Sequence, residues 1–381
     1  MKVLFFANTD WYLYNFKLSL AQAVRERGDE VLLVSPPGPY GEKLAAKGFR
    51  WIAAPMERRS LNPLRELGLL LWLFRLMRRE RVDLVHSFTI KCAVYGALTG
   101  RLAGAKRVNA VAGMGYVFTG DALLARLLRP VVRALMRVSL GGGGARLIIQ
   151  NSDDVAMLSK AGVAAADMIR LVRGSGVDCA RFLPPAPDAA NRTGFRVVLA
   201  SRLLWDKGVG EFVEAARKIK ADDAAVEFVL AGAPDPGNPA SVDEAAARAW
   251  QAEGLVTWLG HVDDMPALFA QADVVALPSY REGLPKSLIE AAACARPLVT
   301  TDVEGCREVV THEIDGLLVP ARDPLALAAA IARLRADPAL ARRLGEAARA
   351  KALTDFDERI VIAKTLAVYD ELETGRRRAG A

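Results

Sequence analysis

Short apolar runs alternate with longer amphipathic stretches along the whole chain. Runs of four to eight residues rich in Val, Ile, Leu and Phe are typical of strands that are buried on both faces. In the first half they predict strands at Lys2–Ala7, Glu30–Ser35, Trp51–Ala54, Leu84–Ser87, Arg107–Ala112 and Leu147–Gln150. The stretches between these runs have the period of helices. The pattern therefore predicts an α/β fold, in which helices cover parallel sheets.

A segment with three prolines in four residues, Pro184–Pro187, interrupts this alternation. Proline continues neither a helix nor a central strand, so we expect a linker at residues 183–194. The alternation then restarts, with predicted strands at Phe195–Ser201, Val226–Ala231, Val256–Leu259, Val274–Pro278, Pro297–Thr301 and Gly316–Val319. We expect two Rossmann-like, doubly wound domains facing a cleft, at residues 1–182 and 195–356. A C-terminal helix with a basic tail, 357–381, is expected to pack back on the first domain and to end near Glu373.

Composition adds a charge asymmetry to this picture. The 381 residues are 52% hydrophobic and 25% charged, which suits two or three globular domains. Residues 1–185 hold 27 basic and 14 acidic side chains, whereas the remainder holds 24 and 30. A basic half favours contact with an anionic membrane, a polyanion or a phosphorylated ligand. Nucleic acid is the weakest of these options, because no recognition motif or aromatic-basic surface accompanies the arginines.

Candidate metal ligands and membrane spans are not apparent. The four cysteines lie far apart and only three histidines are present, so we expect neither a disulfide framework nor a metal site. The first apolar run is broken at Asn8, which is typical of a strand and not of a signal peptide. The longest uncharged apolar stretch, Leu67–Phe74, is far shorter than the roughly 20 residues of a membrane helix. We expect a cytoplasmic protein.

The most informative segment is a predicted strand, a polar loop and a helix over Leu277–Thr300. Glu282 falls in the loop, and Glu290 falls about one and a half turns into the helix. A helix start near Pro285, after the loop residues Gly283 and Leu284, offers unpaired N–H groups that favour an anion such as a diphosphate. Carboxylates beside such a site bind sugar or ribose hydroxyls. Alternatively, Glu282 caps the helix and Glu290 is solvated.

A second strand, loop and helix runs through Leu199–Phe212. Arg202 and Lys207 flank its loop, and two cations at the end of a strand are suited to neutralise a diphosphate leaving group. The alternative is that both cations are simply solvated.

The first domain offers further candidates at the ends of its predicted strands. His86 ends one strand and is either catalytic or a structural histidine. Gly113 and Gly115 form a loop that lines the binding site of a second substrate, the acceptor, or is a plain turn. Asn8, Asp10 and Trp11 follow the first strand and are candidates for contacts with an acceptor.

Two stretches of the first domain, Ser60–Glu80 and Leu123–Arg137, are basic and amphipathic. Such helices are typical of the surface of anionic lipid. Core helices with solvated arginine faces are the alternative. The residues expected at the membrane are Trp72, Arg75, Arg126, Arg129, Arg133 and Arg137.

On these motifs the chain resembles the family 4 glycosyltransferases of GT-B architecture, whose Glu-x7-Glu signature is matched by Glu282 and Glu290. The resemblance implies that Glu282 lies against the donor sugar, that Glu290 binds the nucleotide ribose, and that Arg202 and Lys207 bind the diphosphate. It departs from the family at Phe88, where a second histidine is common. The Leu-Asn-Pro, Leu-Trp-x-Lys-Gly-Val and Pro-Ser-Tyr-x-Glu-Gly patterns are most similar to bacterial transferases that add an N-acetylhexosamine to a polyprenyl-diphosphate-linked saccharide, including α-1,3-N-acetylgalactosaminyltransferases of bacterial N-glycan assembly.

This resemblance implies retaining transfer from a UDP-sugar, without a metal or other cofactor, at the inner face of the cytoplasmic membrane. The expected partners are a nucleotide-sugar donor, a polyprenyl-diphosphate-linked acceptor and the anionic membrane surface. Two alternatives stay open: a UDP-sugar epimerase with the same architecture, and a non-catalytic scaffold for saccharide assembly.

Overall fold

The chain folds into two compact units. The structure, a computed structural model, describes residues 1–58, 60, 62–111, 137, 139, 142, 144–160, 162, 164–185 and 194–379. The N-terminal unit contains Met1–Ser175 together with the C-terminal segment Val361–Ala381, and the C-terminal unit contains Gly176–Ile360.

The N-terminal unit is built on a parallel sheet in the order β3-β2-β1-β4-β5-β6-β7. Its strands are β1 (Lys2–Phe6), β2 (Glu30–Ser35), β3 (Arg50–Ala53), β4 (Leu84–Phe88), β5 (Lys106–Val111), β6 (Ala145–Ile149) and β7 (Ile169–Leu171). The side chains of Val3–Phe6 are fully buried, as expected for a strand covered on both faces. The strand order reverses between β1 and β4, and ligands of open parallel sheets bind beyond the carboxyl ends of such strands.

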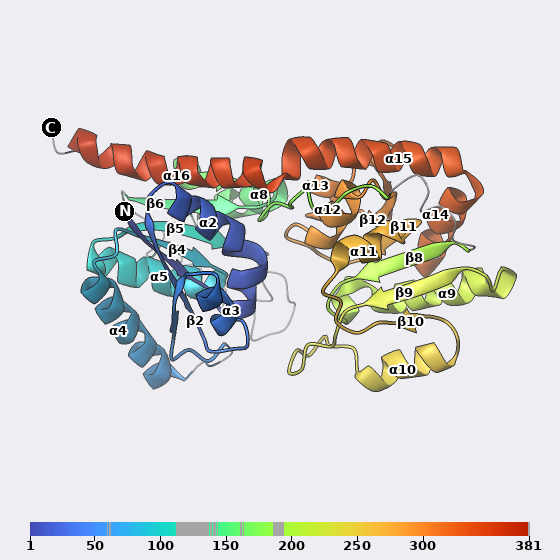
Figure 1. Cartoon of the computed structure of the whole chain (residues 1–381), viewed down its shortest axis with the longest axis horizontal. Coiled ribbons are helices and arrows are strands. Elements are labelled where there is room, and N and C mark those ends of the chain that lie inside the picture. The colour runs from blue at the N-terminus through green and yellow to red at the C-terminus, as the bar shows by residue number, and fades with distance from the viewer. Residues whose placement is uncertain are drawn as a thin grey trace. The chain divides into compact units, whose positions relative to one another are not determined.

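Helices cover both faces of this sheet (Figure 1). They are α1 (Asp10–Tyr12), the π-helix η1 (Leu13–Lys17), α2 (Leu18–Glu26), α3 (Gly41–Ala46), α4 (Pro63–Glu80), α5 (Ile90–Ala103), α8 (Ser152–Lys160) and the 3₁₀ turn η2 (Ala166–Met168). Leu20 and Val24 of α2 pack in one core cluster, and Leu69 and Leu73 of α4 pack in another. Apolar stripes at helical spacing therefore form the core on each side.

The last helix, α16 (Glu358–Ala379), completes the core of the N-terminal unit. Its side chains Val361, Val368, Tyr369 and Leu372 are buried in the same cluster as β1 and α2. The helix continues beyond Glu373, where the sequence was expected to end it. Gly375 lowers helix propensity but does not stop a helix, so the expected end was wrong.

The C-terminal unit repeats the architecture with a parallel sheet in the order β10-β9-β8-β11-β12-β13. Its strands are β8 (Arg196–Ala200), β9 (Glu227–Ala231), β10 (Thr257–Trp258), β11 (Val274–Leu277), β12 (Leu298–Thr301) and β13 (Leu317–Val319). The strand order reverses between β8 and β11. This reversal predicts a binding site beyond the ends of these two strands.

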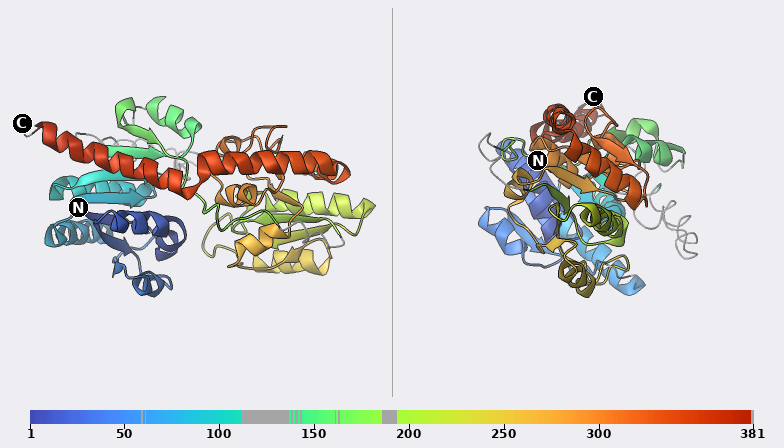
Figure 2. Two further views of the ribbon diagram at one scale, coloured as in Figure 1. Left: turned by 45° about the horizontal axis from the view of Figure 1, so that its top comes forward. Right: turned by 90° about the vertical axis from the view of Figure 1, so that its right-hand side faces the viewer.

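The helical segments of this unit lie on both sides of its sheet (Figure 2). They are the 3₁₀ turn η4 (Trp205–Lys207), α9 (Val209–Asp222), α10 (Glu244–Ala252), α11 (Met265–Ala270), α12 (Lys286–Ala293), α13 (Cys306–Val309), α14 (Pro324–Ala336), α15 (Pro338–Lys351) and the π-helix η5 (Ala352–Phe356). Phe212 of α9 and Leu327 of α14 pack in one cluster, whereas Leu288 of α12 and Ala348 of α15 pack in the other. Both faces are thus apolar, as the sequence predicts.

The boundaries between the units differ from the expected ones. Val177, Cys179 and Phe182 were expected in the first domain but are buried in a core cluster of the C-terminal unit. The chain therefore leaves the N-terminal unit after Ser175, before the prolines. Buried apolar side chains decide this boundary, whereas the prolines mark only an irregular segment. Strand β7 was not predicted either, because three residues carry too little periodicity.

No helix in the described part of the chain combines the length and the apolar character needed to cross a bilayer.

Candidate functional site

Two loops meet where the strand order of the C-terminal unit reverses. One follows β8 and carries Lys207, and the other follows β11 and carries Glu282. The Lys207 ammonium nitrogen lies 2.6 Å from Glu282 Oε1, and the two side chains are only 19% and 9% exposed. The structure therefore brings together two of the residues that the sequence singled out, in a position where a ligand is expected.

Backbone contacts hold these loops against each other. The Tyr280 amide donates to the Asp206 carbonyl at 2.9 Å, and the Ser279 hydroxyl lies 3.0 Å from the same oxygen. Gly208 follows Lys207 with φ of +71°, and a Cβ there would lie 2.1 Å from the Pro278 carbonyl oxygen. Only glycine fits this close approach. The Lys207–Glu282 contact thus depends on the backbone of both loops.

The loop of Glu282 is supported from a third side. The Glu282 amide donates to the Glu304 carbonyl at 3.3 Å. Gly305 has φ of +74°, and a Cβ on it would lie 2.5 Å from the Glu282 carbonyl oxygen. No motif in the sequence predicted this contact.

Helix α12 begins beside Glu282. Its N-cap, Pro285, makes no side-chain hydrogen bond to the first turn, and the N–H groups at the start of a helix favour an anion. Gly283 and Leu284 lie in the loop before it, and both are partly buried.

Glu290 is not the solvated helical residue of the alternative interpretation. It is buried in α12, with Oε1 3.6 Å from Lys286 Nζ. Burial raises the pKa of its carboxyl above the usual value, and the nearby Lys286 ammonium opposes this shift only in part. A buried carboxylate is costly without hydrogen-bond donors, which suits a residue that receives hydroxyl groups from a ligand.

Arg202 stands apart from this pair. Its guanidinium lies 2.6 Å from Asp235 Oδ2, on the loop after β9, and half of its side chain is exposed. Sequence reasoning missed Asp235, because no motif marks a partner 33 residues away.

In the N-terminal unit, His86 is a buried residue of β4. Its Nδ1 lies 2.6 Å from the Tyr369 hydroxyl of α16. Burial, with the nearby Lys17 charge, lowers the pKa of the imidazole well below its usual value, so the ring is neutral at pH 7. Sequence reasoning identified neither Tyr369 nor Lys17, although Lys17 lies soon after the candidate Trp11 in the sequence.

The candidates after β1 have different surroundings. Asp10 is buried, and its carboxylate accepts from the backbone N–H groups of Trp11, Tyr40 and Gly41 at 2.6–2.9 Å. It therefore anchors the start of α3, a structural role. Trp11 is 37% exposed with its ring 5.3 Å from that of Phe16, and Asn8 is partly buried. These two stay candidates for acceptor contacts.

Of the expected membrane residues, the structure describes those of α4 and Arg137. Arg75 is exposed, whereas Trp72 packs partly against the core cluster under α4. Arg137 is exposed and contacts the Gly162 carbonyl. Arg126, Arg129 and Arg133, like Gly113 and Gly115, lie outside the described residues.

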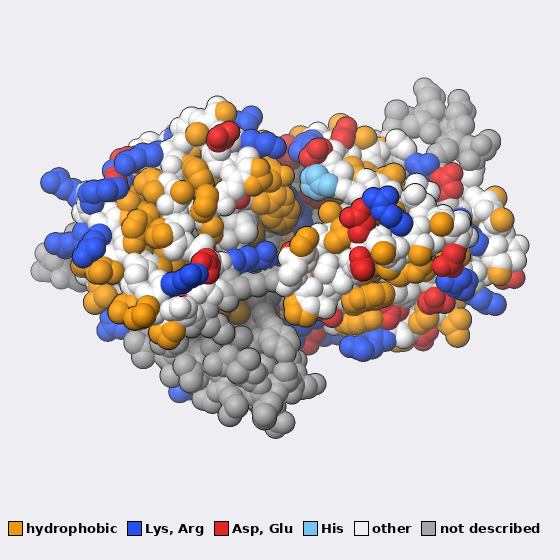
Figure 3. All heavy atoms as spheres, turned by 90° about the horizontal axis from the view of Figure 1, so that it is seen from below, with side chains coloured by type: hydrophobic (Ala, Val, Ile, Leu, Met, Phe, Trp, Pro, Cys, Tyr) orange, Lys and Arg blue, Asp and Glu red, His pale blue; other side chains and the backbone are white. Residues whose placement is uncertain are grey.

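The large apolar side chains that α4 exposes are leucines, and these were not among the residues expected at the membrane. Leu64, Leu67 and Leu71 are 80%, 63% and 45% exposed. Their spacing places them on one face of the helix, and Arg75 and Arg78 continue it. Hydrophobic and basic side chains lie next to one another on the face of this unit that Figure 3 shows.

The described residues contain no group of three or more His, Cys, Asp or Glu side chains placed to hold a metal ion.

Two family models match most of the chain. Residues 2–152 match the model described as glycosyl transferase 4-like, and residues 194–337 match that of glycosyl transferases group 1. A relative from Campylobacter jejuni, N,N'-diacetylbacillosaminyl-diphospho-undecaprenol alpha-1,3-N-acetylgalactosaminyltransferase, is 29% identical over 98% of this chain and 99% of its own length. The Escherichia coli UDP-Gal:alpha-D-GlcNAc-diphosphoundecaprenol alpha-1,3-galactosyltransferase is 24% identical over 83% of this chain and 82% of its own.

Solved structures agree on the fold. The Anabaena protein HepE, crystallised with UDP and glucose, has a TM-score of 0.80 and 21% identity over 97% of this chain and 99% of its own. The sucrose-phosphate synthase of Thermosynechococcus elongatus also has a TM-score of 0.80, with 20% identity over 98% of this chain and the whole of its own. The chain therefore belongs to the group 1 and 4-like glycosyltransferases and has their two-domain GT-B architecture.

Proposed function

We propose that the protein is a retaining glycosyltransferase that moves an N-acetylhexosamine, such as N-acetylgalactosamine, from a UDP-sugar to a polyprenyl-diphosphate-linked saccharide. The observation that carries the proposal is the Lys207–Glu282 pair beside the start of α12. The similarity to the Campylobacter transferase, whose name states both sugar and lipid diphosphate, supports the choice of substrates.

In this mechanism the diphosphate of the donor lies at the start of α12. Lys207 exchanges its contact with Glu282 for a diphosphate oxygen, and the N–H groups of α12 stabilise the charge that develops as UDP departs. Arg202 leaves Asp235 to join them. No metal ion or other cofactor takes part, because these groups supply the positive charge.

The two glutamates position the donor. Glu282, released from Lys207, accepts hydrogen bonds from hydroxyl groups of the sugar. The acceptor hydroxyl attacks the anomeric carbon from the face that UDP leaves, the bond from this carbon to the diphosphate oxygen breaks, and that oxygen takes the proton of the hydroxyl. Glu290 accepts hydrogen bonds from the ribose hydroxyls, and these charge-assisted hydrogen bonds offset the cost of its burial. The new bond therefore has the configuration of the old one.

The acceptor is membrane-borne, so we propose that the N-terminal unit binds the inner face of the cytoplasmic membrane. Support comes from the exposed leucines of α4 and the arginines that continue their face. Apolar side chains flanked by cations are suited to anionic lipid surfaces.

One assay tests this function. The protein is incubated with a panel of UDP-sugars, with and without an undecaprenyl-diphosphate-linked saccharide, and UDP and lipid-linked product are measured. We expect UDP release that depends on the acceptor. Conversion of the donor without acceptor would identify an epimerase, and no turnover with any pair would favour a scaffold. Added EDTA is expected to leave the rate unchanged.

Two variants connect the assay to the site. Glu282→Gln and Lys207→Ala are each expected to lower kcat about 10²–10³-fold, the effect of losing one preorganised charge. Lys220→Ala is the matched control, since this lysine contacts only the surface Gly254 carbonyl among the described residues. If both site variants keep wild-type turnover, the assignment of the site is wrong.

A further inference from the structure

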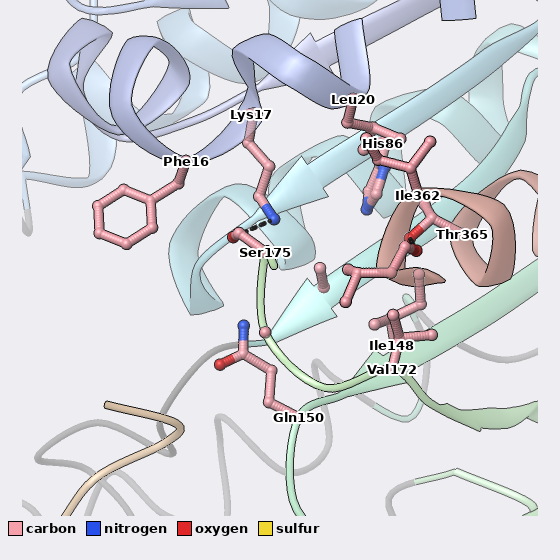
Figure 4. Close-up of a pocket in the computed structure, with 13 residues that line it drawn as sticks. Phe16, Lys17, Leu20, His86, Ile148, Gln150, Val172, Ser175, Ile362 and Thr365 are labelled. Atoms are coloured by element: carbon pink, nitrogen blue, oxygen red, sulfur yellow. Dashed lines mark hydrogen bonds between the residues drawn. The ribbon is translucent and has the colours of Figure 1, made fainter. Parts of the chain in front are cut away.

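The N-terminal unit contains a small cavity, lined by both apolar and polar groups, near the carboxyl ends of β4, β5 and β6. His86, Lys17, Gln150 and Ser175 contribute polar groups to its lining, and its volume is about 20 Å³. Figure 4 shows His86 and Lys17 reaching toward it from different elements, with the Lys17 ammonium on Ser175 Oγ at 2.9 Å. A cavity of this size with polar groups in its lining has room for a single oxygen atom with its hydrogens, as in one water molecule.

The partners of Tyr369 determine where the proton of His86 lies. Among the described residues, His86 Nδ1 is the acceptor within reach of the buried Tyr369 hydroxyl. A buried hydroxyl that does not donate carries the cost of an unsatisfied group, so the hydroxyl donates and Nδ1 accepts. In a neutral ring the proton is then on Nε2.

The other nitrogen is left without a partner. His86 Nε2 is buried and makes no hydrogen bond to any described residue. A buried N–H group without an acceptor costs about 1–3 kcal/mol. An oxygen atom in the adjoining cavity would satisfy it.

We propose that Tyr369 is a positioning residue that holds His86 as a neutral donor, and that Nε2–H binds one hydroxyl oxygen in this cavity. The oxygen belongs to a bound water or to a hydroxyl of the acceptor. The second source rests on the proposed function, because it requires an acceptor in this unit. The first does not.

The position of Tyr369 is itself held by ion pairs of α16. Glu371 lies 2.9 Å from Arg146 and 2.7 Å from Arg170, and Asp370 lies 3.1 Å from Arg27. These contacts of the two residues that follow Tyr369 fix this turn of α16, and the Tyr369 ring lies edge-on to the imidazole of His86. The C-terminal helix thus sets the hydrogen bonding of a residue 283 positions earlier.

Nitrogen NMR of the full chain with ¹⁵N-labelled histidine tests the proposal without any activity. The three histidines give few signals, and His261→Gln and His312→Gln, both at exposed positions, assign that of His86. We expect a proton on Nε2, none on Nδ1, and no further protonation between about pH 6 and pH 8. A proton on Nδ1, or an imidazole that becomes charged in this pH range, overturns the proposal, and this measurement needs only the wild-type protein.

Tyr369→Phe removes the hydroxyl and keeps the ring. In this variant the Nδ1 resonance of His86 is expected to move away from the wild-type value, because the nitrogen no longer accepts a hydrogen bond. Thr365→Val is the matched control: Thr365 also lies on α16 and lines the cavity, but its hydroxyl bonds to the Val361 carbonyl. Equal shifts in both variants, or none in Tyr369→Phe, contradict a specific role of Tyr369.

Undecaprenyl-diphosphate-linked N-acetylhexosamine, added in detergent, separates the two sources of the oxygen. A change at Nε2, with an acceptor KM raised about three- to tenfold in Tyr369→Phe, supports the acceptor hydroxyl. An unchanged Nε2 resonance supports a bound water. Failure of transfer with an Nε2 proton retained would contradict the proposed function and leave the proposal on Tyr369 standing.

Discussion

Burial separates the residues of the proposed donor site from ordinary surface charges. Lys207 and Glu282 share a partly buried ion pair, and the side chain of Glu290 is similarly withdrawn from water, at 12% exposure. Surface pairs of the same unit, such as Arg217 with Glu253, are about half exposed on both sides. Charges that are withdrawn from water without full compensation are typical of binding sites.

Glu290→Gln is predicted to weaken donor binding while preserving or raising stability. The pKa of Glu290 is raised in the folded protein, so ionisation of this carboxyl opposes folding above its usual pKa. The amide removes that penalty. The stability gained should therefore be present at pH 7 and should shrink as the pH falls toward about 4, where the carboxyl is protonated in both states. Urea unfolding at several pH values measures it.

The donor KM of the same variant is predicted to rise, since a neutral amide makes weaker hydrogen bonds to ribose. Glu346→Gln, at an exposed position of α15, is the control for both measurements. A donor KM equal to that of the control would exclude Glu290 from the binding site.

At the level of elements, the turn between η4 and α9 sets the geometry of the site. Gly208→Ala places a methyl group against the Pro278 carbonyl oxygen in a backbone conformation that favours glycine. We predict a loss of stability of about 1–2 kcal/mol from the conformation and about 1–3 kcal/mol more from the clash, together with a lower rate of UDP release.

Gly254→Ala is the matched control for this turn. Gly254 has φ of +73° in the same unit, but a Cβ on it would meet nothing within 4 Å. Gly254→Ala should lose only the stability that the left-handed backbone conformation costs, and it should keep wild-type turnover. Equal losses in the two variants, measured by urea unfolding, would mean that the close approach to Pro278 has no energetic effect.

Helix α4 supplies the second prediction at this level. Leu64, Leu67 and Leu71 changed together to Ser should lower binding to anionic vesicles more than roughly tenfold, since a leucine buried in the acyl region contributes about 1.5–3 kcal/mol. Vesicle sedimentation measures this, and salt should weaken the binding of the wild-type protein. Leu102→Ser, a 73% exposed leucine of α5, is the control. Unchanged binding of the triple variant would contradict the proposed membrane surface.

At the scale of the whole molecule, two separate segments of the chain, Met1–Ser175 and Val361–Ala381, form the N-terminal unit. A chain that ends at Ile360 lacks Val361, Val368, Tyr369 and Leu372, and each buried side chain of this kind contributes about 1.5–3 kcal/mol. We predict that this truncation abolishes the unfolding transition of the N-terminal unit in calorimetry and leaves that of the C-terminal unit. A chain that ends at Thr374 should melt like the full protein. Unchanged melting of the shorter chain would show that α16 is dispensable.

The alternation of strands and helices, apart from β7, and the candidate pairs Glu282–Glu290 and Arg202–Lys207 followed from the sequence alone. The reason is that both depend on short-range patterns. Apolar runs of strand length and the spacing of charges around one loop are visible within a few dozen residues. The α/β architecture was therefore predictable, and so was the position of the two candidate loops at the ends of their strands.

Contacts between distant segments were decided only by the tertiary structure. Lys207 meets Glu282 across 75 positions, Arg202 turns to Asp235, and Tyr369 reaches His86 across 283. Asp10, a candidate ligand in the sequence, proves to anchor backbone N–H groups of the α3 loop. Each of these contacts depends on the packing of whole helices and strands against a common core, and packing energies add up over residues that no local pattern connects.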